Sequence, residues 1–193
     1  MNMGRLVEAA RTESQAWRNG QGRTRELLAW PDPAHWRVRV SVADIDADAA
    51  FSTFPGVQRW FVVLKGAGVD LHVGGGVHHL TRLDAPFGFD GAASVDCHLI
   101  DGPTQDLNLM LRGLPGGMQI VEDGAAWRPA GTACGVFSAI AGRCLLGEEA
   151  IDVPAYALLW FDHAPEELTF RASGRPAGAA GWWLHASPPE QAT

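Results

Sequence analysis

Apolar and polar residues alternate along this chain in short runs that are separated by turns. Residues 36–43 are the clearest case, because a tryptophan and three valines alternate there with two arginines, a serine and an alanine. Successive side chains of a strand point to opposite faces, so this run predicts a strand with one apolar and one polar face. Similar runs continue to the end of the chain, with 23 glycines and 12 prolines in the sequence. This rhythm favours an all-β sandwich or barrel.

A second alternating strand, within residues 102–112, has an unusual polar face. Asp106, Asn108, Met110 and Arg112 share one face, and the three leucines between them share the other. A carboxylate, an amide and a guanidinium therefore lie along one surface. Together they offer hydrogen-bond acceptors, hydrogen-bond donors and the rigid, planar set of N–H donors of an arginine. Such a face suits a small polar ligand, although strands of antiparallel sheets often present a polar face to solvent.

Composition and charge narrow the choice of partner. The chain has 193 residues, 47% hydrophobic and 19% charged, which is enough for one large core or two small ones in a single body. The net charge is -7, and Lys65 is the one lysine among 15 basic residues. With no basic stripe for nucleic acid or anionic lipid, we expect small-molecule or protein partners, and a homodimer is left open. No apolar run suits a signal peptide or a membrane span, so we expect a soluble cytoplasmic protein.

Two sets of residues are expected to serve the core. Cys97, Cys134 and Cys144 are odd in number and lack metal-type spacing, which predicts buried reduced thiols. We expect the barrel wall, and not a ligand site, to contain Phe51, Phe54, Pro55 and Trp60.

Several separated motifs occur together, in one order, across residues 14–112. They are Trp17, Asn19-Gly20, Gly22 and Thr24; Arg39-x-Ser41-x-Ala43; Phe51-Ser52, Phe54-Pro55-Gly56 and Arg59; Gly66-x-Gly68; Pro86-Phe87 and Phe89; and Gly102 to Arg112. In combination these motifs resemble the HutD/Ves family. The chain departs from the family pattern where Gln21, Val38 and Gly113 stand in place of a glycine, an aromatic residue and an arginine.

The resemblance implies an RmlC-like cupin fold in which two antiparallel β-barrel or jelly-roll halves form a bicupin. We expect residues 1–193 to form one such unit, with approximate halves at 1–115 and 116–193, and strand exchange between the halves is left open. The resemblance also implies no established catalysis and an association with histidine utilisation or stress response. For HutD itself it implies a proposed role in sensing an intermediate such as N-formylglutamate.

The first functional hypothesis is a non-catalytic protein that binds a small anionic metabolite in a barrel mouth. The candidate ligand-binding residues are Arg39, Ser41, Asp106, Asn108 and Arg112, with Asn19 and Thr24 adding contacts from a turn. Arginine binds a carboxylate through two parallel hydrogen bonds, and hydroxyl and amide groups complete the shell. We expect Arg39 and Arg112 to converge on one anion, with Asp106 neutralising one positive charge. The same groups could instead form a polar network that closes the barrel.

The alternative hypothesis is a cupin-type enzyme, either a metal-dependent oxygenase or a metal-free isomerase. Its metal candidates are Asp70, His72 and His78, and its acid and base would be Asp106 and His98.

The hairpin that carries two of these histidines lies within residues 69–80. If Val73 pairs with Val77, His72 faces His78 across the ladder, and the two could share a metal ion. The cupin metal set needs a His-x-His pair and a downstream Glu, and neither spacing occurs here. We therefore expect no metal and no other cofactor, and we favour binding over catalysis.

Overall fold

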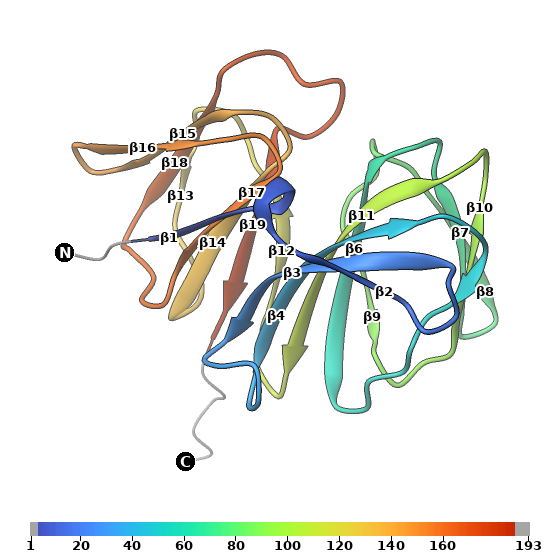
Figure 1. Ribbon diagram of the computed structural model, residues 1–193. Helices are drawn as coiled ribbons and strands as arrows, with labels where there is room; N and C mark the ends of the chain where they lie inside the picture. The colour runs from blue at the N-terminus through green and yellow to red at the C-terminus, as the bar shows by residue number, and fades with distance from the viewer. Residues whose placement is uncertain (1–3, 188–193) are drawn as a thin grey trace. The chain divides into compact units, whose positions relative to one another are not determined.

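The computed structural model describes residues 4–187, which consist almost wholly of antiparallel strands (Figure 1). The helical element in this range is one 3₁₀ turn, Ala9–Arg11, and no described helix is long and apolar enough to cross a membrane. The chain separates into two compact units: unit 2 is Glu13–Gly113, and unit 1 combines the residues up to Thr12 with those from Leu114 onward. The all-β class predicted from the alternating pattern is confirmed.

Unit 2 is a sandwich of two antiparallel sheets. The six-stranded sheet has the order β2-β3-β4-β11-β6-β9, with bounds Ser14–Ala16, Gly22–Trp30, Val38–Ile45, Thr104–Arg112, Val57–Lys65 and Phe87–Asp90. The four-stranded sheet has the order β5-β10-β7-β8, with bounds Ala49–Ala50, Val95–Leu99, Val69–Val73 and Gly76–Leu80. Apolar side chains of both sheets form one core, in which Phe61 and Val63 of one sheet join Leu71 of the other.

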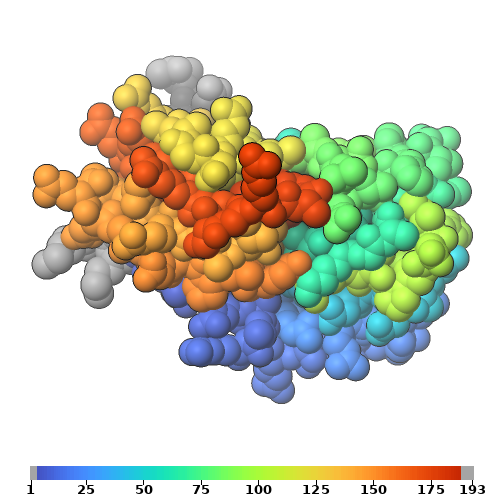
Figure 2. Space-filling view, turned by 90° about the horizontal axis from the view of Figure 1, so that it is seen from above, coloured from blue at the N-terminus to red at the C-terminus, as the bar shows by residue number. Residues whose placement is uncertain are grey.

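Unit 1 is also built from two antiparallel sheets. The five-stranded sheet has the order β1-β17-β14-β19-β12, with bounds Arg5–Glu8, Ala157–Phe161, Ala133–Ser138, Gly181–Ala186 and Gly116–Ile120. The four-stranded sheet has the order β13-β18-β15-β16, with bounds Ala126–Trp127, Leu168–Ala172, Gly142–Leu146 and Glu149–Val153. β19 pairs antiparallel with β12, with Leu184 opposite Met118. Figure 2 shows red residues from late in the described chain beside yellow ones from its middle.

The two units repeat one topology. The order β4-β11-β6-β9 in unit 2 becomes β12-β19-β14-β17 in unit 1 when eight is added to each strand number, and β5-β10-β7-β8 becomes β13-β18-β15-β16 in the same way. Each unit therefore has the same two-sheet jelly-roll plan, which is the repeat expected of a cupin-type fold.

The first described strand belongs to unit 1. β1 pairs antiparallel with β17, with Leu6 opposite Leu159, and in Figure 1 this dark blue strand lies beside β17. A boundary between residues 115 and 116 would leave β1 in the first half of the chain. The compact units are consequently not two continuous halves.

The three cysteines are free and buried, as predicted. Burial raises the pKa of the Cys97, Cys134 and Cys144 thiols to about 12. The thiolate is the reactive form of cysteine, so these side chains act as small apolar core residues.

Candidate ligand-binding site

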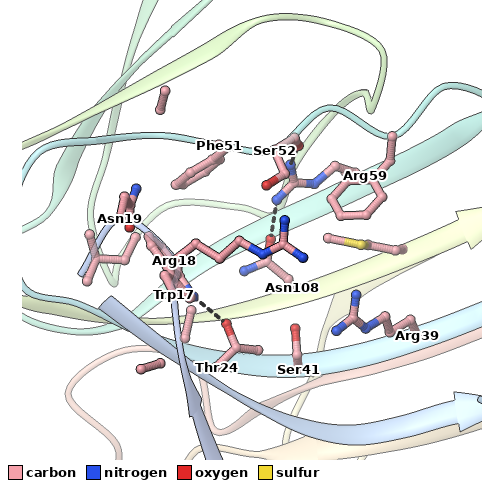
Figure 3. Close-up of a pocket in the computed structure, with 16 residues that line it drawn as sticks. Trp17, Arg18, Asn19, Thr24, Arg39, Ser41, Phe51, Ser52, Arg59 and Asn108 are labelled. Carbon is pink, nitrogen blue, oxygen red and sulfur yellow. Dashed lines mark hydrogen bonds between the residues drawn. The ribbon is translucent and has the colours of Figure 1, made fainter. Parts of the chain in front are cut away.

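Unit 2 contains a cavity of about 470 Å³, a size that suits a small metabolite. Its lining comes from β2 and the turn that follows it, from β3, β4, β6 and β11, and from β5 and the segment after it. Three arginines line it, Arg18, Arg39 and Arg59, and the lining contains no Asp or Glu (Figure 3). This concentration of positive charge contrasts with the net charge of -7 of the whole chain.

The register of three neighbouring strands places the polar lining in rows. Met110 of β11 lies opposite Arg39 of β4 on one side and opposite Arg59 of β6 on the other. In the next row, Asn108 lies opposite Ser41. Residues directly opposite each other in a sheet point to the same face. The two arginines, the amide and the hydroxyl therefore share one inner surface.

Arg59 is the central cation of the site. Its side chain is 5% exposed, donates through Nη2 to Asn108 Oδ1 at 3.0 Å and through Nη1 to the Ser52 carbonyl at 3.3 Å. Its guanidinium carbon lies 5.2 Å from the ring centre of Phe51 and 4.9 Å from that of Phe89. Its Nε has no hydrogen-bond partner among the described residues. Burial, with a smaller contribution from Arg39, lowers the pKa of this guanidinium to about 10.

These contacts do not replace a counter-ion for Arg59. Removing a charged group from water costs several kcal/mol, whereas a cation–π contact returns about 0.5 to 2 kcal/mol. No carboxylate in the described part of the chain forms an ion pair with Arg59. An anion in the cavity would supply the missing partner.

Arg39 differs from Arg59 because it has a carboxylate beside it. Its Nε lies 2.6 Å from Glu26 Oε2, in an ion pair that lacks the angle of a hydrogen bond. Both side chains are partly exposed, 25% for Arg39 and 34% for Glu26. The three cavity arginines and Glu26 together leave two positive charges without a partner.

Two further lining residues, Asn19 and Thr24, form hydrogen bonds with residues of the turn that precedes β3. Thr24 Oγ1 accepts a hydrogen bond from Trp17 Nε1 at 2.8 Å and keeps its own proton for donation. Asn19 donates to Gln21 Oε1 at 2.8 Å and accepts from the Gln21 backbone N–H at 3.1 Å. The side chain of Asn19 is therefore committed to Gln21.

The structure brings five of the seven predicted ligand-binding residues together. Arg39, Ser41, Asn108, Asn19 and Thr24 line the cavity.

Arg112 does not line the cavity. It lies at the end of β11, one row beyond Met110, and its exposed guanidinium stacks over the Trp36 ring at 4.0 Å. The expectation that Arg39 and Arg112 converge on one anion is therefore wrong. Strand alternation predicted the correct face for each arginine, but it does not tell how far along the strand Arg112 lies from the cavity.

Asp106 also lies outside the cavity lining, one row deeper than Asn108. Its side chain is fully buried and accepts a hydrogen bond from Thr104 Oγ1 at 2.7 Å. Burial raises the pKa of its carboxyl well above the ordinary value of 3.8, which favours the neutral acid. Asp106 does not neutralise an arginine, contrary to the prediction.

The hairpin histidines do not share a site. Val73 pairs with Gly76, so His72 lies opposite Val77, while His78 lies opposite Leu71 and points to the other face. This register is one residue away from the one that would bring His72 and His78 together. Among the described residues, no group of three or more His, Cys, Asp or Glu side chains is placed to hold a metal ion.

The predicted acid and base of the enzyme hypothesis are also apart. His98 is exposed and its Nδ1 lies 3.0 Å from Asp48 Oδ2, whereas Asp106 is fully buried. No hydrogen bond joins His98 to Asp106 in the described structure.

Sequence reasoning missed Arg18 and Arg59 as site residues and assigned Phe51 and Phe54 to the barrel wall alone. Both phenylalanines line the cavity. A signal for Arg59 was available, because it occupies an apolar-face position of its strand, two residues before Phe61. A charged residue at such a position needs a partner.

Comparison with known proteins identifies the family. The sequence model of the HutD family matches residues 9–175. The chain belongs to the HutD family. Protein Ves of Citrobacter koseri is 30% identical over 178 residues, which cover 90% of this chain and 92% of the relative. An uncharacterized 21.2 kDa protein in the hutC 3'region of Pseudomonas putida is 37% identical over 115 residues, covering 57% of this chain and 59% of that protein.

The fold comparison agrees with the sequence comparison. The structure of HutD from Pseudomonas fluorescens SBW25 superposes with a TM-score of 0.81 and 25% identity, covering 95% of this chain and 98% of that chain. The HutD/Ves resemblance found in the motifs is thereby confirmed for this HutD-family chain.

Proposed function

We propose that this HutD-family protein binds a small carboxylate metabolite in the cavity of unit 2 and does not transform it. The observation that supports the proposal most strongly is Arg59, a nearly buried cation that lines the cavity and has no carboxylate partner in the described structure. Arginine presents paired donors that match the two oxygens of a carboxylate. The Ser41 hydroxyl and the free proton of Thr24 add neutral donors around the same space.

Two of the relatives support a proposal for the identity of the metabolite. The HutD structure from Pseudomonas fluorescens is described with a formate condition, and the Pseudomonas putida relative lies beside hutC. We propose an acidic intermediate of histidine breakdown, of the N-formylglutamate type, as the ligand, and control of histidine utilisation as the purpose of binding it. Formate serves as the smallest probe of the carboxylate position.

The test is titration calorimetry with formate, glutamate and N-formylglutamate. We expect the wild type to bind at least one of them and Arg59→Met to bind it about 30-fold or more weakly, as for loss of a buried charged partner. Arg112→Gln is the matched control, because it removes the same charge outside the cavity and should leave the affinity within about twofold. Equal binding by wild type and Arg59→Met would refute the site.

The cupin-type enzyme remains a separate hypothesis with its own readout. Each candidate ligand is incubated with the protein, with and without added Fe²⁺, Mn²⁺, Ni²⁺ or Zn²⁺, and followed by NMR. The binding proposal expects the ligand spectrum to keep the same compounds after many hours. Conversion of the ligand would make the protein an enzyme.

A further inference from the structure

Arg18 is the cavity arginine that the proposed function leaves without a role. It lies in the turn between β2 and β3, lines the cavity and is exposed. Arg39 has Glu26 beside it and Arg59 has Asn108, but no described hydrogen bond, ion pair or ring contact involves the Arg18 side chain. In Figure 3 the Arg18 side chain extends across the pocket from the turn that carries Asn19. Unlike Arg39 and Arg59, Arg18 has no partner among the described residues that would compete with a ligand for its guanidinium.

The backbone on both sides of Arg18 is held in place. The Trp17 N–H donates to the Gly22 carbonyl at 2.9 Å, and the Gly20 N–H donates to the Trp17 carbonyl at 3.0 Å. Gly20 has φ +72°, a left-handed conformation that glycine adopts without steric cost. The Asn19–Gln21 pair adds two hydrogen bonds across the same turn. Because the turn is already ordered, a ligand that binds Arg18 has to restrict only the side chain.

The charge balance specifies the chemical class of the ligand. Arg18, Arg39 and Arg59 carry three positive charges, and Glu26 offsets one of them. One carboxylate on Arg59 would leave the charge of Arg18 at the mouth without a partner. A ligand with two carboxylates would neutralise both.

We propose that the cavity prefers dicarboxylates, with Arg59 and Asn108 binding the inner carboxylate and Arg18 binding the outer one. The inner half of this assignment rests on the proposed function. The new element is Arg18, which determines whether a second carboxylate is favoured. The carbon chain between the two charges would pass the apolar part of the lining, which includes Trp17, Phe51 and Phe54.

The test compares glutarate with its monoamide, which has the same length and one carboxylate fewer. We expect calorimetry at low salt to give the wild type a preference of about fivefold for glutarate, the upper range for an exposed ion pair. Arg18→Gln should lower the preference to about twofold, the statistical factor for two equivalent carboxylates, while leaving the affinity for the monoamide unchanged. The preference of the wild type should also shrink as salt is added, because exposed charges are screened.

Two control variants accompany Arg18→Gln. Arg23→Gln removes an equal charge from an exposed position outside the cavity lining and should keep the preference. Arg18→Lys keeps the charge and should retain a preference above that of Arg18→Gln.

The outcomes separate this inference from the proposed function. If the monoamide binds in an Arg59-dependent way but glutarate binds no more than about twofold better, or if the preference of about fivefold survives in Arg18→Gln, the role of Arg18 is refuted and the inner site stands. If neither compound binds to the wild type, or if both bind equally well to Arg59→Met, the proposed function and this inference both fail.

Discussion

The two units share one topology but differ in the polar side chains that they bury. The buried polar or charged residues of unit 2 are Ser41, Arg59, Thr104, Asp106 and Asn108. In the described part of unit 1 the buried polar residue is Ser138. The six residues of β14, the counterpart of β6, are all buried, and none of them is charged. One jelly roll has an apolar interior, and the other carries a cation inside.

The difference is clearest inside the two units, where Trp183 of the five-stranded sheet meets Trp127 of the four-stranded sheet in unit 1. In unit 1 the Trp127 and Trp183 rings stack in parallel, with centres 4.6 Å apart and an angle of 6°. In unit 2 the inner face carries Arg59 beside an open cavity. A filled interior contributes stability, whereas a buried cation without a counter-ion costs stability. The comparison therefore supports the proposal that unit 2 binds the ligand and that unit 1 serves the fold.

The largest expected effect is loss of stability in unit 1. Trp183 is 2% exposed, so Trp183→Ala should lower the free energy of unfolding by about 3 to 5 kcal/mol. Carboxylate binding to the folded protein should be unchanged. Urea unfolding and calorimetry check the two parts. If Trp183→Ala kept the stability of the wild type but no longer bound the carboxylate, unit 1 and not unit 2 would be the binding unit.

Arg59→Met should not lower the free energy of unfolding, in contrast to Trp183→Ala. The change removes a buried charge whose desolvation costs several kcal/mol, and this gain offsets the cost of about 1 to 3 kcal/mol for an acceptor left without its donor at Asn108. We expect the urea midpoint of the ligand-free variant to equal or exceed that of the wild type. A loss of more than about 3 kcal/mol, typical of breaking a buried pair, would show instead that Arg59 serves the fold.

Asp106→Asn should change the pH dependence of stability. Burial raises the native pKa of Asp106, so the native state keeps a proton that the unfolded state loses above the ordinary pKa of 3.8. Stability from this group is therefore present below about pH 4 and falls as pH rises, by at most about 1.4 kcal/mol per pH unit until the native pKa is passed. The asparagine variant should gain on the wild type between pH 4 and pH 7.

Urea unfolding at several pH values measures this gain. Asp96→Asn, an exposed change of equal charge, is the control and should show no such trend. A constant difference between Asp106→Asn and wild type across this pH range would mean that Asp106 is ionised in the fold.

The smallest expected effect comes from two buried serines. Ser138 Oγ donates to the Pro154 carbonyl at 2.5 Å and accepts from the Ala157 N–H at 3.3 Å in unit 1, whereas Ser41 lines the cavity of unit 2. Ser138→Ala should cost about 1 kcal/mol of stability and no affinity, and Ser41→Ala should weaken carboxylate binding by roughly two- to tenfold with little change in stability. The same pattern in both variants would remove the contrast between the units.

Much of the fold could be predicted from the sequence because strand periodicity is local. The alternation in residues 36–43 and 102–112 correctly placed Arg39, Ser41 and Asn108 on one inner face. The register of a hairpin depends on the length of its turn, and Gly74 and Gly75, both with positive φ, form a two-residue turn in place of the three glycines expected. That shift of one residue separates His72 from His78.

The depth of a side chain along its strand was also hidden from the sequence. Asp106, Asn108 and Arg112 share a face but lie in different rows: one is in the core, one is in the cavity and one is beyond the rim. Arg59 could have been predicted from its apolar-face position. Arg18 could not, because only the folded turn brings it to the cavity.

The central claim, that the carboxylate site lies in the cavity of unit 2, can be tested most directly by NMR. The chain has 8 tryptophans, whose indole N–H groups give separate signals once assigned. Trp17 lines the cavity and donates its indole N–H to Thr24, whereas Trp127 and Trp183 stack in unit 1. On titration with glutarate we predict a saturable shift of the Trp17 indole signal and none for Trp127 or Trp183. Saturable shifts at Trp127 or Trp183, with Trp17 unmoved, would contradict the account.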